Sequence, residues 1–283
     1  MPELTTLVTG RGLVESARWH DGRLWFADWF AHEIVAVDID GDSDVVLRDP
    51  SVPLCFDWLP DGRLLVVAGK RLLRREPDGS VATHADLDDL SPFGWNDIAV
   101  DDRGNVYVDN VGFEFPGGEF APGVLAVVRQ DGAARQVAGG VAFPNGLAVT
   151  PDGASLIVAE SYSRKLTAFD IDADGGLANQ RLWADLGDGV PDGICVDAEG
   201  AVWYADVPNR RCARVREGGE VVETVELDRG CFSCTLGGAE GRTLFIVAAQ
   251  WGGTDGMAGM AGTGQVIAAE VSVAAARRRR LPK

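Results

Sequence analysis

The stretch from Phe143 to Ser161, FPNGLAVTPDGASLIVAES, contains two short apolar runs joined by a Pro-Asp-Gly turn. An Asp-Gly dipeptide between apolar runs is typical of a tight antiparallel β-hairpin. Asn145 does not fit this pattern, because it is polar and stands at the start of a strand otherwise suited to burial. The stretch therefore predicts a hairpin with one carboxamide that needs an explanation.

The hairpin recurs six times along the chain. Each copy is an apolar run, a turn that ends in glycine and a second apolar run, usually followed by a third and a weaker fourth. The turn glycines, 40 to 49 residues apart, are Gly22, Gly62, Gly104, Gly153, Gly200 and Gly241. Four strands in such a period is the size of a propeller blade. We predict an all-β fold, a single six-bladed β-propeller domain of four-stranded blades over residues 1–283.

The two ends of the chain are predicted to share one blade. The N-terminal run LTTLVT and the C-terminal run GQVIAAEVSV are both β-rich. Pairing them would close the ring and remove the edge that an open sheet exposes. Two stacked β-sandwiches are the alternative, but they would not require such regular spacing.

The composition excludes some partners. A formal net charge of -17 would repel nucleic acid and anionic membranes, so we expect neither as a partner. The chain contains no apolar run of membrane-spanning length and no basic-then-apolar start, so we expect a cytoplasmic protein. Five irregularly spaced cysteines predict reduced, buried thiols. The sequence does not indicate an oligomeric state.

Equivalent positions in the copies explain Asn145. The first strand of each blade lines the central axis, so equivalent residues point to one level of the channel. Four residues before the last core residue of that strand, four copies have an oxygen-bearing side chain: Glu15, Asn96, Asn145 and Asp192. The second copy has Leu54 there, and the sixth has a residue near Ser233. We call the four oxygen-bearing residues the axial ring.

The axial ring allows two interpretations. Carboxylate and amide oxygens suit a hard cation, with Ca²⁺ as the first expectation and Mg²⁺, Mn²⁺ or Zn²⁺ as alternatives. Polar residues that merely hydrate a water-filled channel would give the same pattern. The repulsion between two facing acids favours the cation. Four more polar residues stand six or seven residues after the turn glycines: Asp28, Asn110, Glu160 and Asp206. They are predicted to surround the axial ring as a second shell, which either orients it or contacts substrate.

Four segments together resemble the family of senescence marker protein, gluconolactonase and luciferin-regenerating enzyme, a group of six-bladed propellers. They are LVESARWHDGRLWFAD, WNDIAVDDRGNVYV, PNGLAVTPDGASLIVAES and PDGICVDAEGAVWYAD. The resemblance implies metal-dependent lactone hydrolysis, with Glu15, Asn145 and Asp192 as metal ligands. It also implies Asn96 as a further ligand or substrate contact, and Asp192 as the general base.

The sequence departs from this family at Gly94, where sugar-lactone hydrolases tend to have an arginine that binds sugar hydroxyls. Aromatic residues near the predicted mouth would suit a less polar substrate, with Trp29, Trp95 and Phe143 as candidate contacts and Phe30 and Trp251 nearby.

Two long connections and the function itself leave alternatives open. The segment 111–123 is either a lid or an ordinary surface connection, and 251–262 is glycine-rich and predicted to be flexible. The favoured function is a metal-dependent lactonase. The alternatives are a binding propeller with a structural metal, and a different metal-assisted reaction at the same site.

Overall fold

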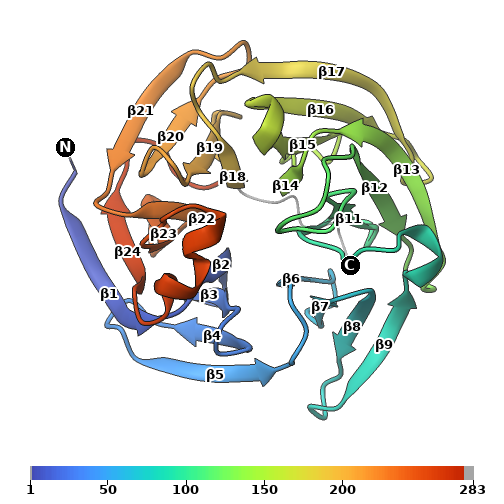
Figure 1. Cartoon of the computed structure of the whole chain (residues 1–283), viewed down its shortest axis with the longest axis horizontal. Helices are drawn as coiled ribbons and strands as arrows, with labels where there is room; N and C mark the ends of the chain where they lie inside the picture. Colours follow the sequence, from blue (N-terminus) through green and yellow to red (C-terminus); the bar gives the residue numbers. More distant parts are fainter. Residues whose placement is uncertain (1, 277–283) are drawn as a thin grey trace.

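Six four-stranded antiparallel sheets surround a central axis in the computed structural model, which describes residues 2–276 (Figure 1). The predicted six-bladed β-propeller is therefore confirmed. The first three blades consist of β2 (Val14–His20), β3 (Arg23–Asp28), β4 (Glu33–Val37) and β5 (Ser43–Arg48); β6 (Leu54–Trp58), β7 (Leu64–Ala68), β8 (Arg71–Arg75) and β9 (Val81–Asp86); and β10 (Ile98–Val100), β11 (Val106–Asn110), β12 (Gly123–Val128) and β13 (Ala134–Val141).

The other three blades follow the same order, with one exception at the end. They consist of β14 (Pro144–Val149), β15 (Ser155–Glu160), β16 (Lys165–Ile171) and β17 (Leu177–Asp185); β18 (Pro191–Val196), β19 (Val202–Asp206), β20 (Arg211–Val215) and β21 (Val221–Glu226); and β22 (Gly230–Gly237), β23 (Thr243–Ala249), β24 (Gly264–Glu270) and β1 (Leu4–Arg11). The 3-10 helices are η1 (Asp88–Leu90), η2 (Ser161–Ser163) and η3 (Thr254–Met260).

The N-terminal strand closes the sixth blade, as predicted. β1 pairs with β24 in antiparallel register, with Leu4 opposite Ala269, and Figure 1 shows these two strands side by side at the outer rim. Without β1, the backbone groups of β24 that face it would form an unpaired sheet edge.

All six predicted turn glycines adopt a left-handed backbone, with φ between 71° and 87°. This conformation is easy for glycine and strained for most other residues. It lets each hairpin reverse within a few residues.

Apolar contacts between neighbouring blades form the core. Six buried clusters each join two adjacent blades; the cluster between blades 2 and 3, for example, contains Leu65, Val67, Trp95 and Val106. The middle strands are buried on both faces, which explains why their sequences are continuous apolar runs.

The five cysteines are free thiols, and four of them are fully buried, as expected. Among residues 2–276, no helix is long and apolar enough to cross a membrane. The cytoplasmic location stays a prediction.

We expect deletion of residues 1–11 to destabilise the ring and cause self-association, because the edge of β24 becomes free to pair with another chain. Melting temperature and light scattering after gel filtration measure both effects. Deletion of residues 1–3 alone, which leaves β1 intact, is the matched control. Equal behaviour of the two deletions would contradict a closing role for β1.

Candidate active site

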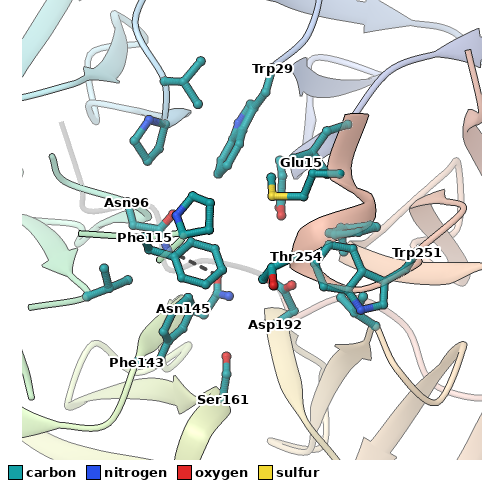
Figure 2. A pocket seen from close by; sticks show the side chains of 18 of the residues that line it. Glu15, Trp29, Asn96, Phe115, Phe143, Asn145, Ser161, Asp192, Trp251 and Thr254 are labelled. Atoms are coloured by element: carbon teal, nitrogen blue, oxygen red, sulfur yellow. Dashed lines mark hydrogen bonds between the residues drawn. The ribbon is translucent and has the colours of Figure 1, made fainter. Parts of the chain in front are cut away.

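The four side chains of the axial ring lie together at one mouth of the channel. Glu15, Asn96, Asn145 and Asp192 all line a cavity of about 990 Å³ (Figure 2). The structure thus brings together the residues that their equivalent positions in the repeats had predicted.

A β-bulge accompanies the ring residue in three of these blades. The register between the first two strands shifts between Glu15 and Arg18 in β2, between Pro144 and Leu147 in β14, and between Pro191 and Ile194 in β18. A bulge adds a residue to one strand and redirects the side chains beside it. It therefore allows a polar side chain to face the axis in a strand whose remaining residues pack between blades.

The same irregularity corrects the prediction for the sixth blade. β22 shifts register between Cys231 and Ser233, and Phe232 is the residue that lines the cavity there. The Ser233 hydroxyl accepts a hydrogen bond from the Ala17 backbone at 3.1 Å. In the second blade the equivalent residue is Leu54, which is apolar and fully buried. This blade therefore contributes no polar side chain at this level.

The two amides of the axial ring contact each other. Asn96 Nδ2 donates a hydrogen bond to Asn145 Oδ1 at 3.3 Å. The Asn96 backbone N–H donates to the carbonyl oxygen of Asp109 at 2.9 Å, and Asp109 is a buried acid that the sequence analysis missed. Because a carboxamide oxygen has two lone pairs, Asn145 can accept this bond and still offer an oxygen to a ligand.

The two carboxyl groups are electrostatically strained. Burial, followed by the charge of Asp192, raises the pKa of Glu15 well above its usual value. Burial, followed by the charge of Asp97, raises the pKa of Asp192 in the same way. Asp192 Oδ1 is buried and has no hydrogen-bond partner, whereas Glu15 Oε2 accepts one from the Ser16 backbone at 3.2 Å.

These observations fit a hard divalent cation. Asp192 has a buried carboxylate oxygen without a partner, and its charge disfavours that of Glu15. The amide oxygen of Asn145 lies close by. Ca²⁺ and Mg²⁺ bind to oxygen donors of this kind. In the described part of the chain, no group of three or more His, Cys, Asp or Glu side chains could hold a metal ion, so the amides of the axial ring would have to complete the site.

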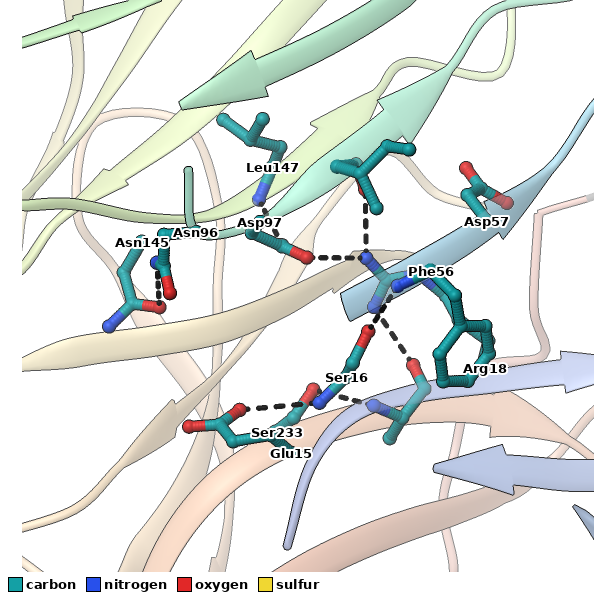
Figure 3. Close-up of polar contacts among 12 residues, drawn as sticks. Glu15, Ser16, Arg18, Phe56, Asp57, Asn96, Asp97, Asn145, Leu147 and Ser233 are labelled. Carbon is teal, nitrogen blue, oxygen red and sulfur yellow. Dashed lines mark hydrogen bonds and ion pairs between the residues drawn. The ribbon is translucent and has the colours of Figure 1, made fainter. Parts of the chain in front are cut away.

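An ion pair between Arg18 and Asp97 lies beside the axial ring (Figure 3). Arg18 Nη2 lies 3.0 Å from Asp97 Oδ1, and the other oxygen of Asp97 accepts a hydrogen bond from the Leu147 backbone at 3.0 Å. Arg18 also donates to two backbone carbonyl groups, those of Ala17 and Ile98. The guanidinium thereby connects the first blade to the third, and Asp97 extends the connection to the fourth. In the sequence, the only sign of this ion pair was a charged residue, Arg18, in a strand that is otherwise largely apolar.

The four polar residues predicted to surround the axial ring form hydrogen bonds with backbone groups. Each is the last residue of the second strand of its blade and lies close to the start of the first strand. Asp28 accepts a hydrogen bond from Gly12 N at 3.1 Å, Glu160 accepts one from Ala142 N at 2.8 Å, and Asp206 accepts one from Val190.

Asn110 belongs to the same set and donates to Gly94 O at 2.5 Å. The four side chains therefore hold the chain two or three residues before each member of the axial ring. None of them lines the cavity, so they position the ring residues and do not contact the cavity contents.

Trp95 corrects the prediction of substrate contacts. Trp29, Phe143, Phe30 and Trp251 line the cavity, but Trp95 is fully buried in the cluster between blades 2 and 3. Successive side chains of an extended chain point in opposite directions. Since Asn96 faces the axis, its neighbour Trp95 faces the adjacent blade.

Two segments form the walls above the axial ring. The connection 111–122 lies over the cavity and contributes Phe113 and Phe115. The segment predicted to be flexible contains η3, whose Met260 is fully buried against Leu13 and Phe232. A methionine within this glycine-rich sequence thus packs into the core, and the predicted flexibility of the segment stays a prediction.

The family model described as "SMP-30/Gluconolactonase/LRE-like region" matches residues 13–250. The chain belongs to this family. Pentonolactonase XacC of Haloferax volcanii is 28% identical over 262 residues, 87% of this chain and 84% of the relative. Regucalcin of Xenopus laevis is 31% identical over 183 residues, 61% of this chain and 60% of the relative.

A solved structure confirms the fold of this SMP-30/gluconolactonase-like chain. A regucalcin from Agrobacterium tumefaciens, described as a calcium-binding protein, superposes with a TM-score of 0.82. It is 20% identical and covers 98% of this chain and 96% of its own.

In the presence of a chelator, we expect the melting temperature of the wild type to fall more steeply between pH 4 and 8 than that of Asp192→Asn. The folded-state pKa values of Glu15 and Asp192 are raised, so the folded protein holds protons that the unfolded chain releases near pH 4. The penalty is absent below that pH and grows as pH rises toward the folded pKa values.

Scanning calorimetry across this pH range measures the difference. We expect the variant to melt a few degrees higher at pH 8, at about 2–4 °C per kcal/mol. Parallel curves for the two proteins would contradict the assigned repulsion.

We expect Gly146→Ala to displace Asp192. A Cβ atom on Gly146 would lie 2.5 Å from the Asp192 carbonyl oxygen and 2.7 Å from Ile194 N, so the backbone must move. Overpacking of this kind costs about 1–3 kcal/mol. Thermal unfolding and Ca²⁺ titration should both change, whereas Gly259→Ala, whose Cβ meets nothing within 4 Å, should change neither. A normal Ca²⁺ affinity in Gly146→Ala would contradict the close packing of β14 on β18.

Proposed function

We propose that this protein is a divalent-metal-dependent lactonase, a carboxylic ester hydrolase that opens cyclic esters. The observation that carries the proposal is the buried, partnerless oxygen of Asp192 within a ring of oxygen donors at the base of a small-molecule cavity. Membership of the family and the similarity to a pentonolactonase support the same reaction.

Glu15, Asn145 and Asp192 would hold the cation, with Asn96 as a further ligand or a substrate contact. Ca²⁺ is the first candidate, because the donors are all oxygen atoms and the related regucalcin structure is described as calcium-binding. A bound cation would polarise the lactone carbonyl group and stabilise the negative charge that develops on its oxygen.

Asp192 is assigned as the general base. Water attacks the carbonyl carbon, its proton passes to Asp192, and the ring C–O bond then breaks. The leaving alkoxide takes up the proton, so that one lactone and one water give one hydroxy acid.

The other residues orient and shield the reaction. Asn96, whose side chain bonds to Asn145 and whose backbone bonds to Asp109 O, presents its side chain beside the reacting group. Trp29 and Phe143 form walls of the cavity that exclude water from its base. Arg18, committed to Asp97 and two carbonyl groups, keeps the strands below the axial ring at fixed separation.

We expect Asp192→Ala to lower kcat/KM for lactones by about 10²–10⁴-fold, the usual contribution of a general base. The Ca²⁺-induced rise in melting temperature should disappear as well, which gives a readout independent of turnover. Glu217→Gln changes an exposed carboxylate far along the sequence from the axial ring and should behave as wild type.

Metal-dependent turnover that survives in Asp192→Ala would reject the assigned base. A normal Ca²⁺ response without turnover of any lactone by the wild type would reject the lactonase and favour a propeller with a structural metal.

A further inference from the structure

One wall of the cavity is built from aromatic rings. Phe113 and Phe115 from the connection 111–122 pack against Phe143 and Tyr162 of the fourth blade. The centroids of Phe115 and Phe143 are 4.9 Å apart, and Phe143 stacks on Tyr162 at 4.5 Å. Figure 2 shows Phe115 and Phe143 beside the two amides of the axial ring. We call these four side chains the aromatic wall.

Part of the aromatic wall remains uncovered. Phe115 is 39% exposed and Tyr162 is 53% exposed, although both line the cavity. Apolar rings at a cavity mouth gain free energy when a ligand covers them, at about 25 cal/mol per Å² of apolar surface. The wall therefore favours a ligand with an apolar surface of its own.

The opposite side of the cavity is also apolar. Trp251 meets Phe232 edge to face at 5.9 Å, and Met257 of η3 lies beside them along the cavity. Trp29 completes this side, and its indole N–H is already bonded to Leu54 O at 2.8 Å. A ligand above the axial ring would thus contact apolar groups on two sides.

Outside the axial ring, the side chains that could bind the hydroxyl groups of a sugar are chiefly those of His32, Glu114, Ser161, Tyr162 and Thr254. The Ser161 hydroxyl already donates to Pro191 O at 2.7 Å. Gly94, where an arginine would bind sugar hydroxyls, lines the cavity and offers no side chain. Each sugar hydroxyl that finds no partner among these groups loses its hydrogen bonds to water, and that loss is costly.

The charges at the cavity disfavour an anionic ligand. Among the described residues, no Lys or Arg side chain lines this cavity, whereas Glu114 does so beside the acids of the axial ring. A divalent cation would neutralise Glu15 and Asp192 and leave Glu114 uncompensated. A phosphorylated, sulfonated or carboxylated lactone would meet this repulsion without a cationic partner.

We propose that the preferred substrates are uncharged lactones that carry an aryl or alkyl group, with the apolar group against the aromatic wall and the ester at the axial ring. The proposal rests on the proposed lactonase function and adds the substrate class. It places substrate selectivity in residues 111–122, outside the axial ring.

The test compares dihydrocoumarin and γ-nonalactone with D-glucono-δ-lactone in the full-length protein with Ca²⁺, each kcat/KM being divided by the uncatalysed rate. We expect the apolar lactones to exceed the sugar lactone by tenfold or more. Phe115→Ser should lower the corrected kcat/KM for dihydrocoumarin about tenfold and leave the sugar lactone unchanged. Leu182→Ser, which changes an exposed apolar residue of β17 that does not line the cavity, should have little effect on either.

A binding measurement separates this inference from the lactonase proposal. The lactam 3,4-dihydroquinolin-2-one, which has the shape of dihydrocoumarin and resists hydrolysis, should bind the wild type and bind Phe115→Ser about tenfold more weakly. This pattern without any lactone turnover would support the apolar pocket and reject the lactonase. An equal or greater preference for the sugar lactone would overturn the substrate class and leave the lactonase intact, and absence of lactam binding would also overturn it.

Discussion

The constraint on which this structure depends is the convergence of six first strands at one axis. Each strand must bury apolar residues against its neighbours and still satisfy backbone groups that face the channel. Side chains that bond to the backbone of the next blade meet this need: Ser16 to Phe56, Asp57 to Val100, and Asp97 to Leu147. These bonds set the separation of the strands, and the separation sets the size of the axial ring.

Where side chains are absent, the contact is closer. Gly146 lies directly on the backbone of residues 192–194, and Gly193 lies against Ser233. Polar links thus join the first four blades in succession, and glycine contacts join the fourth blade to the fifth and the fifth to the sixth. Burial at this axis is the main reason why the pKa values of Glu15 and Asp192 are raised, and the charges of neighbouring acids raise them further.

Sequence reasoning could predict the blades, because left-handed glycines and apolar runs are local properties. It also located Glu15, Asn96, Asn145 and Asp192, since equivalent positions in a repeat share one level of the channel. It failed where a side chain's direction depends on a neighbouring blade, as for Trp95. The Arg18–Asp97 pair was equally hidden, because its two partners are separated by 79 residues. The fold of η3 depends on the burial of one methionine, which composition does not indicate.

Asp28, Asn110, Glu160 and Asp206 show how a repeat separates two tasks. One level of the channel carries the chemistry, and the ends of the second strands hold the chain that leads into it. Because these four side chains bond to backbone groups, their work does not depend on which side chain occupies the ring. The ring residue or the wall above it can therefore differ between related proteins without loss of the support.

The closure of the last blade by the first strand has a consequence for biosynthesis. β1 leaves the ribosome first, but its partner β24 emerges only after five complete blades, so the pairing of Leu4 with Ala269 waits for nearly the whole chain. The cavity takes residues from Leu13 to Ala261, so a chain that stops before Ala261 lacks part of its walls. A chain that stops before β24 would contain β1 without its partner, and the ring of blades would stay open.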